Sequence, residues 1–385
     1  METSQKTSTP SPRFNWVNKT PREHRKAHER KYHFNNLARA YRSWLVPYVK
    51  SRIFSGEFRP VLSFLYTDLN CNIDCHYCYA NKSMPGMTRQ VAEDSVDWLN
   101  SRGCRVLAYM GGEPLLRKRF VIDLTRYAVE KGFFVYLPTN GILLDRDFVD
   151  EIGEAGVSTI NLAVDTVDYR EGLPKYFERI KPQFEYLVQQ EHKYGYITFF
   201  NINITENNME DVRKLTEIAH SYGIASDYHI NEPPLIRYDY FKHEQDGGWI
   251  KEEKYQAVDE VIDWLIEKNR QGYTMVNSLE HLQSMKQFIR HQLPPWPCQA
   301  GQITMIIRLD GSFAPCFELY GDMEDWGNIY EGPKFDPIKL DERKRICSRH
   351  CLSTCNFQGY HYTRSSLYTL QWLAKHAYAR FMGVS

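Results

Sequence analysis

The sequence has no apolar run approaching the roughly 20 residues that a membrane-spanning helix needs. Its first residues, METSQKTSTPSPRF, lack the apolar stretch of a secretory signal peptide. It has no excess of charge, with 48 Lys and Arg against 48 Asp and Glu, so there is no global signature of nucleic-acid binding. No long internal repeat is present. These absences favour a cytoplasmic protein, in a reducing compartment where thiols usually serve metals or catalysis.

What is present fits a globular chain of 385 residues with 42% hydrophobic and 25% charged residues. This length allows one large domain with one or two smaller pieces. The charge is unevenly distributed, because residues 18–53 contain ten Lys and Arg but only two Glu, a net charge of +8. Residues 1–16 are rich in Ser, Thr and Pro and are expected to be disordered.

Apolar strand-like segments alternate with helical segments from about residue 60, and several of the helical segments end in glycine. This alternation predicts an α/β fold with a parallel sheet and outer helices, and six units indicate a partial (β/α)6 TIM-like barrel. Functional residues of such folds lie at the carboxyl ends of the strands. The predicted strands are residues 61–68, 105–110, 133–138, 158–165, 196–204 and 224–231.

The nine cysteines fall into two groups, three at positions 71–78 and five at positions 298–355, with Cys104 alone. The first group, CNIDCHYCYA, directly follows the first predicted strand. Three thiols do not pair into disulfides and are one short of a closed zinc site, so they suit a metal centre with one open position. Cys104 is expected to be a small buried residue.

Cys71, Cys75 and Cys78, with Tyr77 before the last cysteine, resemble the Cx3CxΦC signature of the radical SAM superfamily. The resemblance implies that the three thiolates hold a catalytic [4Fe–4S] cluster whose fourth iron binds S-adenosylmethionine. It implies reductive cleavage to a 5′-deoxyadenosyl radical, which abstracts hydrogen from substrate, with flavodoxin or ferredoxin as electron donor. Tyr77 would contact the adenine region. A zinc knuckle is the alternative.

The segment YMGGEPLL, after the second predicted strand, resembles the GGEP motif of the same superfamily. The resemblance implies that Gly111, Gly112 and Glu113 bind the methionine end of S-adenosylmethionine. Glycines permit close backbone approach, and a carboxylate accepts hydrogen bonds from an ammonium group.

Weaker resemblances follow the next strands. The PTNG turn at 138–141 is similar to a common turn of the family, and NLAVDTVD suggests Asp165 as a ribose contact. Asn203, at the end of the fifth predicted strand, is a further cofactor-binding candidate. The alternative for the turn and for Asp165 is ordinary turn chemistry of Asn-Gly and Asp.

Cys298, a spacer and the GX4C segment that ends at Cys316 resemble the SPASM or twitch domains that carry auxiliary clusters. Two auxiliary clusters need about seven or eight thiols, so five cysteines indicate a twitch domain with one [4Fe–4S] cluster. Cys347, Cys351 and Cys355 are the later candidate ligands, but their spacing departs from the family's tighter CxxC and leaves open which of them ligate. A structural zinc site is the alternative.

The expected organisation has five parts, and a hairpin turn is predicted at Asp310–Gly311. The parts are a basic, partly disordered N-terminal arm (1–55), a radical SAM partial barrel (56–235), a helical bridge (236–295), a twitch or SPASM-type auxiliary [4Fe–4S] domain (296–360) and a C-terminal amphipathic helix (361–385).

The resulting hypothesis is a radical SAM enzyme acting on a lipid or small metabolite. The alternatives are a maturase of a ribosomal peptide and a non-catalytic zinc-binding scaffold. For the basic arm and the C-terminal helix we favour a cap on the barrel, and the alternative is peripheral docking on the anionic inner face of a membrane. No nucleic-acid partner is expected, because no binding motif is present.

Overall fold

The structure is a computed structural model that describes most of the chain between residues 60 and 357. Most of the predicted basic arm and all of the predicted C-terminal helix lie outside the described residues. Within the described part, no helix has both the length and the apolar character needed to cross a membrane. The described residues are 42–43, 46–53, 60–78, 80, 82, 85–231, 250–317, 319–321, 324–347, 351–353 and 356–357.

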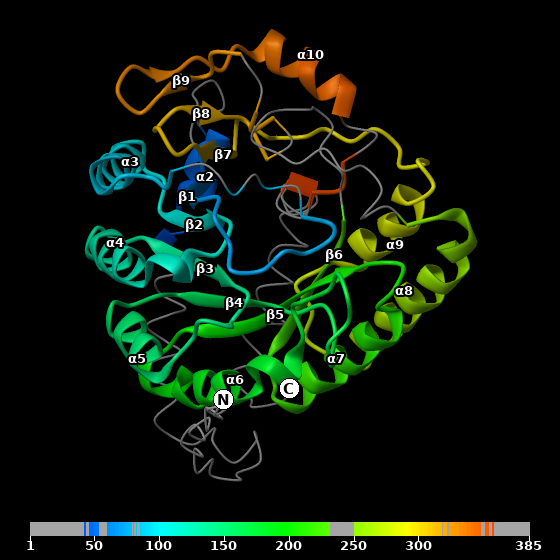
Figure 1. The fold of residues 1–385 in the computed structure, drawn as a ribbon. Coiled ribbons are helices and arrows are strands. Elements are labelled where there is room, and N and C mark those ends of the chain that lie inside the picture. Colours follow the sequence, from blue (N-terminus) through cyan, green and yellow to red (C-terminus); the bar gives the residue numbers. More distant parts are fainter. Residues whose placement is uncertain are drawn as a thin grey trace, which may run out of the picture.

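All six predicted strands are present and pair in chain order as a parallel sheet, which curves as a partial barrel (Figure 1). The predicted fold class is therefore confirmed. The full order in this sheet is β6-β5-β4-β3-β2-β1-β7-β8. The strands are β1 (Leu62–Asp68), β2 (Val106–Gly111), β3 (Phe134–Thr139), β4 (Thr159–Ala163), β5 (Ile197–Ile204), β6 (Ala225–Ile230), β7 (Thr304–Ile307) and β8 (Phe313–Ala314).

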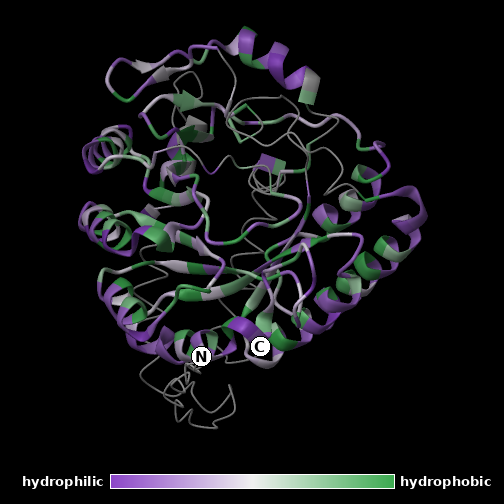
Figure 2. Cartoon of the chain, viewed as in Figure 1, coloured by the Kyte–Doolittle hydropathy of each residue, from purple (hydrophilic) through white to green (hydrophobic). Residues whose placement is uncertain are grey.

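Helices cover the outer face of the sheet, and their apolar sides point inward in Figure 2. Local signals set several boundaries: Thr88 and Asp145 cap two N-termini with their side chains, and Gly195 ends a helix at φ 75°. These helices are α3 (Arg89–Ser101), η2 (Pro114–Arg117), α4 (Lys118–Glu130), α5 (Arg146–Glu154), α6 (Phe177–Tyr194) and α7 (Met209–Ser221).

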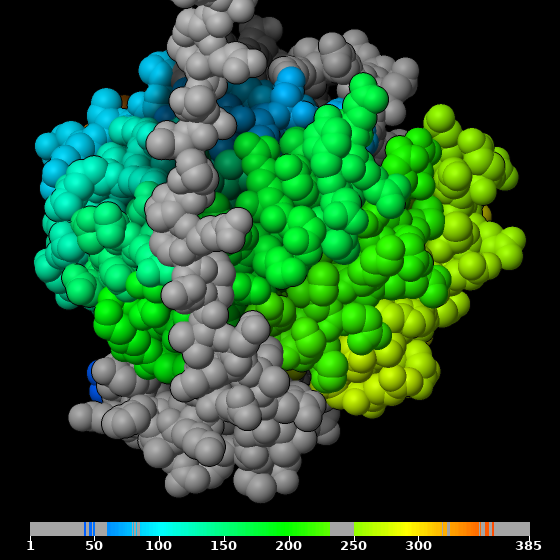
Figure 3. Space-filling view, turned by 60° about the horizontal axis from the view of Figure 1, so that its bottom comes forward, coloured from blue at the N-terminus to red at the C-terminus, as the bar shows by residue number. Residues whose placement is uncertain are grey.

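Further helices precede and follow the barrel in the sequence. In Figure 3 the green atoms of the second half of the barrel lie beside the yellow-green atoms of the bridge helices, in agreement with the packing of α7 against α8. These helices are α2 (Val46–Ile53), η3 (Glu252–Lys254), α8 (Tyr255–Arg270), α9 (Leu279–Phe288) and α10 (Pro337–Cys347).

The alternation of side chains along the strands separates an outer from an inner face. On β5, Phe200 and Ile202 are fully buried in the core formed with the helices. Asn201 and Asn203 alternate with them and therefore face the inside of the barrel. The inner face at this side of the sheet is polar, although the strand is among the most apolar of the sequence.

The predicted hairpin forms, with its turn at Asp310–Gly311, but it is also part of the barrel sheet. β7 pairs in parallel with β1, and β8 pairs antiparallel with β7. The sequence analysis did not anticipate the pairing with β1. It places the segment that begins with Cys298 directly beside the strand that leads to Cys71. A small second sheet follows, formed by β9 (Gly327–Asn328) and β10 (Gly332–Pro333).

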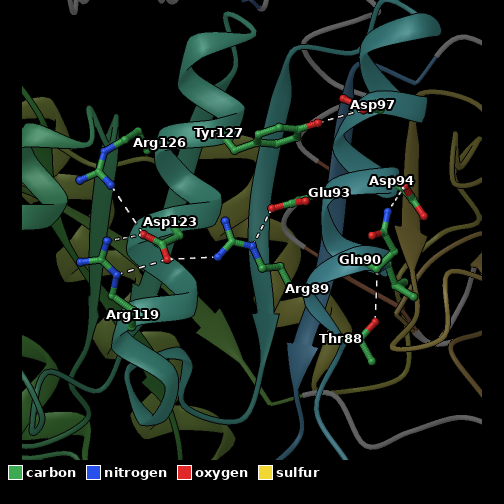
Figure 4. Close-up of polar contacts among 11 residues, drawn as sticks. Thr88, Arg89, Gln90, Glu93, Asp94, Asp97, Arg119, Asp123, Arg126 and Tyr127 are labelled. Carbon is green, nitrogen blue, oxygen red and sulfur yellow. Dashed lines mark hydrogen bonds and ion pairs between the residues drawn. The ribbon is translucent and has the colours of Figure 1, made fainter.

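An exposed ion-pair network joins α3 to α4 on the outside of the barrel (Figure 4). Asp123 lies 2.7 Å from Arg119 Nη2 and 3.5 Å from Arg89 Nη1. Tyr127 donates a hydrogen bond to Asp97 at 2.9 Å. Such solvent-exposed pairs contribute little to stability, so the buried apolar faces of these helices hold them in place.

Candidate functional site

The first three cysteines lie in the loop that leaves the carboxyl end of β1. Cys75 is buried, Cys71 and Cys78 are half-buried, and all three are free thiols. A turn in which Cys78 N donates to Cys75 O at 2.9 Å brings the last two close in the chain. The loop therefore presents its thiols at the edge of the sheet where active sites of such barrels lie.

Burial raises the pKa of the Cys71 thiol and raises the pKa of Cys75 to about 11. Negative charge on Cys78 raises both pKa values further, so the three sulfurs are close enough to influence one another electrostatically. The described residues contain no group of three or more His, Cys, Asp or Glu side chains that could hold a metal ion. Three free thiols in one short loop, one buried and two half-buried, have the donor chemistry of an iron–sulfur site, whose ligands lose their protons when metal binds.

The two glycines of GGEP lie against the backbone that leads into this loop. Gly112 N donates to Asp68 O at 2.9 Å, and Glu113 N donates to Asn70 O at 2.7 Å. A Cβ atom on Gly112 would lie 1.9 Å from Asn70 O, and one on Gly111, at φ +132°, would lie 1.6 Å from Asp68 O. Only glycine permits this contact, which fixes the residues immediately before Cys71.

Glu113 is buried and already holds three hydrogen bonds. One carboxylate oxygen accepts from Leu115 N at 3.0 Å and from Thr139 Oγ1 at 2.7 Å, and the other accepts from Asn140 N at 2.8 Å. Burial raises the pKa of Glu113, and these hydrogen bonds oppose the increase. The carboxylate thus anchors the PTNG turn, a structural role that the sequence did not indicate.

Asn140 continues this connection to the cysteine loop. Its Nδ2 donates to Asn72 Oδ1 at 2.8 Å and lies 3.9 Å from Cys71 Sγ. Its own backbone N is held by Glu113. Three motifs that are far apart in the sequence, the cysteine loop, GGEP and PTNG, are therefore one connected unit in space.

On the other side of the loop, Tyr77 joins a buried polar cluster. Its hydroxyl donates to Asp165 Oδ2 at 2.5 Å and accepts from Lys175 Nζ at 2.8 Å. Asp165 Oδ1 also accepts from Asn203 N at 3.2 Å, so these three predicted residues lie together. Asn208, fully buried, donates to the backbone oxygens of both Asp165 and Asn203 at 2.7 Å.

Sequence reasoning missed Lys175 and Asn208. Burial alone would lower the pKa of Lys175, but the Tyr77 hydroxyl and the Asp165 carboxylate raise it well above its usual value. Neither missed residue belongs to a motif. The one available signal was the position of Asn208 directly before α7, where Asn is a common helix cap.

Replacing Tyr77 by phenylalanine should lower the free energy of unfolding by about 1–2 kcal/mol, because the buried Asp165 carboxylate loses a donor. Urea unfolding followed by circular dichroism measures this loss. Tyr330→Phe is the matched control, because the Tyr330 hydroxyl also donates to a carboxylate, Asp94 at 3.1 Å, but on an exposed side chain. Equal losses in the two variants would contradict a structural role of the Tyr77 hydroxyl.

The C-terminal thiols lie around the hairpin and the end of α10. Cys298 and Cys316 are half-buried, and Cys347 and Cys351 are buried; Cys355 lies outside the described residues. Cys298 Sγ accepts a hydrogen bond from Ala300 N, and Cys351 Sγ accepts one from Ser353 N, each at 3.4 Å. Such N–H donors stabilise thiolates and tune the potential of iron–sulfur clusters.

The lone cysteine is where the sequence predicts it. Cys104 is fully buried, and its thiol contacts Val61 O at 3.4 Å and Ser63 Oγ at 3.8 Å. It belongs to the core between sheet and helices.

Comparison with known families agrees with this geometry. Residues 69–225 match the family described as the Radical SAM superfamily. This segment begins just before the cysteine loop and ends at the start of β6. This part of the chain is therefore similar to the domain of an enzyme superfamily that uses a [4Fe–4S] cluster and S-adenosylmethionine.

Curated relatives of known activity match over part of their length. An AdoMet-dependent heme synthase of Methanosarcina barkeri is 31% identical over 169 residues, which is 42% of this chain and 47% of that protein. An Fe-coproporphyrin III synthase of the same organism is 26% identical over 233 residues, 57% of this chain and 55% of that protein. The chain spans about half the length of these relatives.

Solved structures share the fold at low sequence identity. Streptococcus suis SuiB bound to its precursor peptide SuiA superposes with a TM-score of 0.56 at 16% identity, over 77% of this chain and 70% of that chain. The anSMEcpe structure with bound AdoMet and a peptide gives a TM-score of 0.52 at 20% identity, over 71% of this chain and 78% of that chain. Both similarities extend beyond residues 69–225, the part that matches the family.

Proposed function

We propose that this protein is a radical SAM enzyme whose catalytic cluster is held by Cys71, Cys75 and Cys78. The observation that carries the proposal is the thiol loop at the carboxyl end of β1, within the radical SAM domain and fixed by the GGEP backbone. The cluster, when bound and reduced, supplies the electron that cleaves S-adenosylmethionine to a 5′-deoxyadenosyl radical. A flavodoxin or ferredoxin is the class of donor that we expect.

The residues of the chain have separate tasks in this proposal. Gly111 and Gly112 fix the cysteine loop and leave their backbone near the methionine end of S-adenosylmethionine. Glu113 holds the PTNG turn. Its second carboxylate oxygen accepts a hydrogen bond from Asn140 N alone among the described residues, so it can accept another from a ligand. Asp165, with Asn203 behind it, orients Tyr77 toward the nucleoside end.

The inner face of the barrel supports a polar substrate. Asn161, Asn201 and Asn203 lie on the inner faces of β4 and β5, by the strand alternation described above. On β6, Asp227 is 7% exposed and its Oδ1 has no hydrogen-bond partner within the described residues, while Oδ2 lies 3.2 Å from His229 Nε2. This polar side favours a small metabolite over a lipid whose reacting part is an acyl chain. The names of the curated relatives, such as the heme synthase, agree with a small-molecule substrate.

A ribosomal peptide is the second candidate substrate. It is favoured by the shared fold with SuiB, which was solved with a precursor peptide. One experiment distinguishes the two candidate substrates, because peptides and small metabolites can be separated by extraction. Aqueous and organic extracts of a deletion strain and its parent, compared by mass spectrometry, should show a precursor that accumulates in the aqueous metabolite fraction. Accumulation of an unmodified short peptide would support the second candidate instead.

We also propose that the segment 296–360 forms a twitch-type domain and that its cysteines hold one auxiliary [4Fe–4S] cluster. The GX4C hairpin beside β1 and the N–H donors to Cys298 and Cys351 support this part of the proposal. We propose the remaining segment boundaries from the sequence pattern. They are 1–55, 56–235, 236–295 and 361–385. Peripheral membrane contact through the basic arm is not part of the favoured function.

Anaerobic purification tests the function directly. The wild-type chain should be brown, contain about eight iron atoms and release 5′-deoxyadenosine from S-adenosylmethionine when dithionite is added. Iron analysis, absorbance and liquid chromatography measure these three properties. A colourless protein that contains zinc and does not cleave S-adenosylmethionine would refute the proposal in favour of a scaffold.

A further inference from the structure

One face of α10 is buried, although the helix is otherwise exposed and strongly charged. Leu340, Lys344 and Cys347 follow at helical spacing on this face and are 2%, 7% and 8% exposed. Ile338, by contrast, is 72% exposed on the same helix. The burial of a lysine between a leucine and a cysteine is unusual, because lysine is almost never fully buried unless it is paired.

The buried face of α10 lies on the segments that carry Cys298 and Cys316. A Cβ atom at Gly301 would lie 2.9 Å from a methyl carbon of Leu340 and 3.2 Å from Pro315, the residue before Cys316. Gly301 N donates to Pro315 O at 3.0 Å, so these two segments are joined under the helix.

Lys344 extends from α10 into this region. Its Nζ donates a long hydrogen bond, at 3.4 Å, to the side-chain oxygen of Gln302. Gln302 follows Cys298 by four residues. Cys347 is one turn further along the helix, with its Sγ 3.5 Å from Lys344 O. Cys298, Cys316 and Cys347, which come from separate segments, are therefore close enough to act electrostatically on Lys344.

The positive charge of the Lys344 ammonium group is not compensated by a negatively charged neighbour among the described residues as long as the thiols are neutral. Within the described residues, no carboxylate lies within 4.0 Å of its Nζ, and Asp341, one turn earlier, is exposed. Burial lowers the pKa of Lys344, while negative charge on Cys298, Asp341, Cys316 and Cys347 would raise it. A buried ammonium group needs a compensating anion, and thiolates bound to a metal centre provide one.

We propose that Lys344 is the counter-charge of an anionic iron–sulfur centre held by Cys298, Cys316 and Cys347 with a fourth ligand. The inference rests on the auxiliary cluster of the proposed function and deepens it by naming three ligands and their cation. Cluster thiolates carry net negative charge, which increases when the cluster takes up an electron. A fixed cation beside them favours the reduced form and raises the reduction potential.

The test uses the full-length triple variant Cys71→Ala, Cys75→Ala, Cys78→Ala, so that the iron that remains belongs to the C-terminal thiols. This variant should retain about four iron atoms. Adding Lys344→Met should shift the reduction equilibrium at least tenfold toward the oxidised cluster, which is about 59 mV for one electron. Adding Lys344→Arg, which keeps the charge, should leave the midpoint potential near that of the triple variant. Potentials are measured by redox titration with electron paramagnetic resonance.

The outcomes separate the inference from the proposed function. Loss of iron with Lys344→Met but not with Lys344→Arg also supports a counter-charge. An unchanged potential with Lys344→Met, or equal effects of both substitutions, would overturn the inference while leaving the auxiliary cluster intact. A triple variant without iron, beside a wild-type chain with about four iron atoms, would remove the auxiliary cluster and the inference together but leave the catalytic site standing.

Discussion

Replacing Cys75 by alanine is expected to abolish cleavage of S-adenosylmethionine, with a fall in rate of at least about a thousandfold. The same variant should lose about four of about eight iron atoms. Cys75 is the most buried of the three thiols, so no water or neighbouring side chain easily replaces its sulfur. The two cysteines that remain in the loop of this variant are too few to hold the cluster. Release of 5′-deoxyadenosine and iron content are measured on anaerobically prepared protein.

Cys104→Ala is the matched control for this prediction. Cys104 is also buried and also has a raised pKa, to about 11, because it is desolvated in the core. It lies between sheet and helices and touches no other cysteine by any contact described above. Its loss should cost about 1 kcal/mol of stability through a small cavity, while iron content and cleavage stay at wild-type levels. Equal loss of iron in the two variants would contradict the assignment of Cys75 as a ligand.

Replacing Gly112 by alanine should lower the free energy of unfolding by about 3 kcal/mol or more, or prevent folding, and should reduce iron bound at the first thiol group. The added methyl group would lie 1.9 Å from Asn70 O and 2.7 Å from Leu69 O, both backbone atoms. To relieve this overlap, the segment before Cys71 must move away from the end of β2. Urea unfolding and iron analysis measure the two effects.

Gly103→Ala is the control for backbone effects of glycine replacement. Gly103 has φ +79°, and an added Cβ would meet no atom within 4 Å. Its replacement should cost about 1 kcal/mol, the price of a left-handed conformation, with no loss of iron. If Gly112→Ala were as mild as this control and bound as much iron, the close approach of the two loops would not be what holds the thiols in place.

Much of the fold was available from the sequence because it depends on local patterns. Apolar runs of strand length separated by amphipathic helices predict a parallel sheet, and each of the six strands lies within one or two residues of its predicted bounds. The cysteine loop was also predictable, because Cx3CxΦC is a contiguous motif placed directly after a strand. The roles of the cysteines and of the GGEP and Asp165 segments remain predictions that the experiments above test.

The side-chain contacts inside the site could not be predicted from the sequence. The lysine at position 175 contacts Tyr77 across 98 positions of the chain, and no periodicity or spacing marks such a contact. The same is true of Glu113, whose carboxylate holds the turn after β3 by hydrogen bonds that span 26 and 27 positions. A motif names a residue type, but its hydrogen-bond partners depend on which strands are neighbours.

The sequence by itself thus determined the class of fold, the positions of its first six strands and the place of the first thiol group, because these follow from local periodicity and from contiguous motifs. Only the tertiary structure decided that β7 pairs with β1, that the GGEP glycines contact the backbone before Cys71, and that Lys344 is buried on the face of α10 that carries Cys347. The physical reason is that burial, close approach and charge pairing are properties of segments distant in the chain. They exist only once the barrel has brought those segments together.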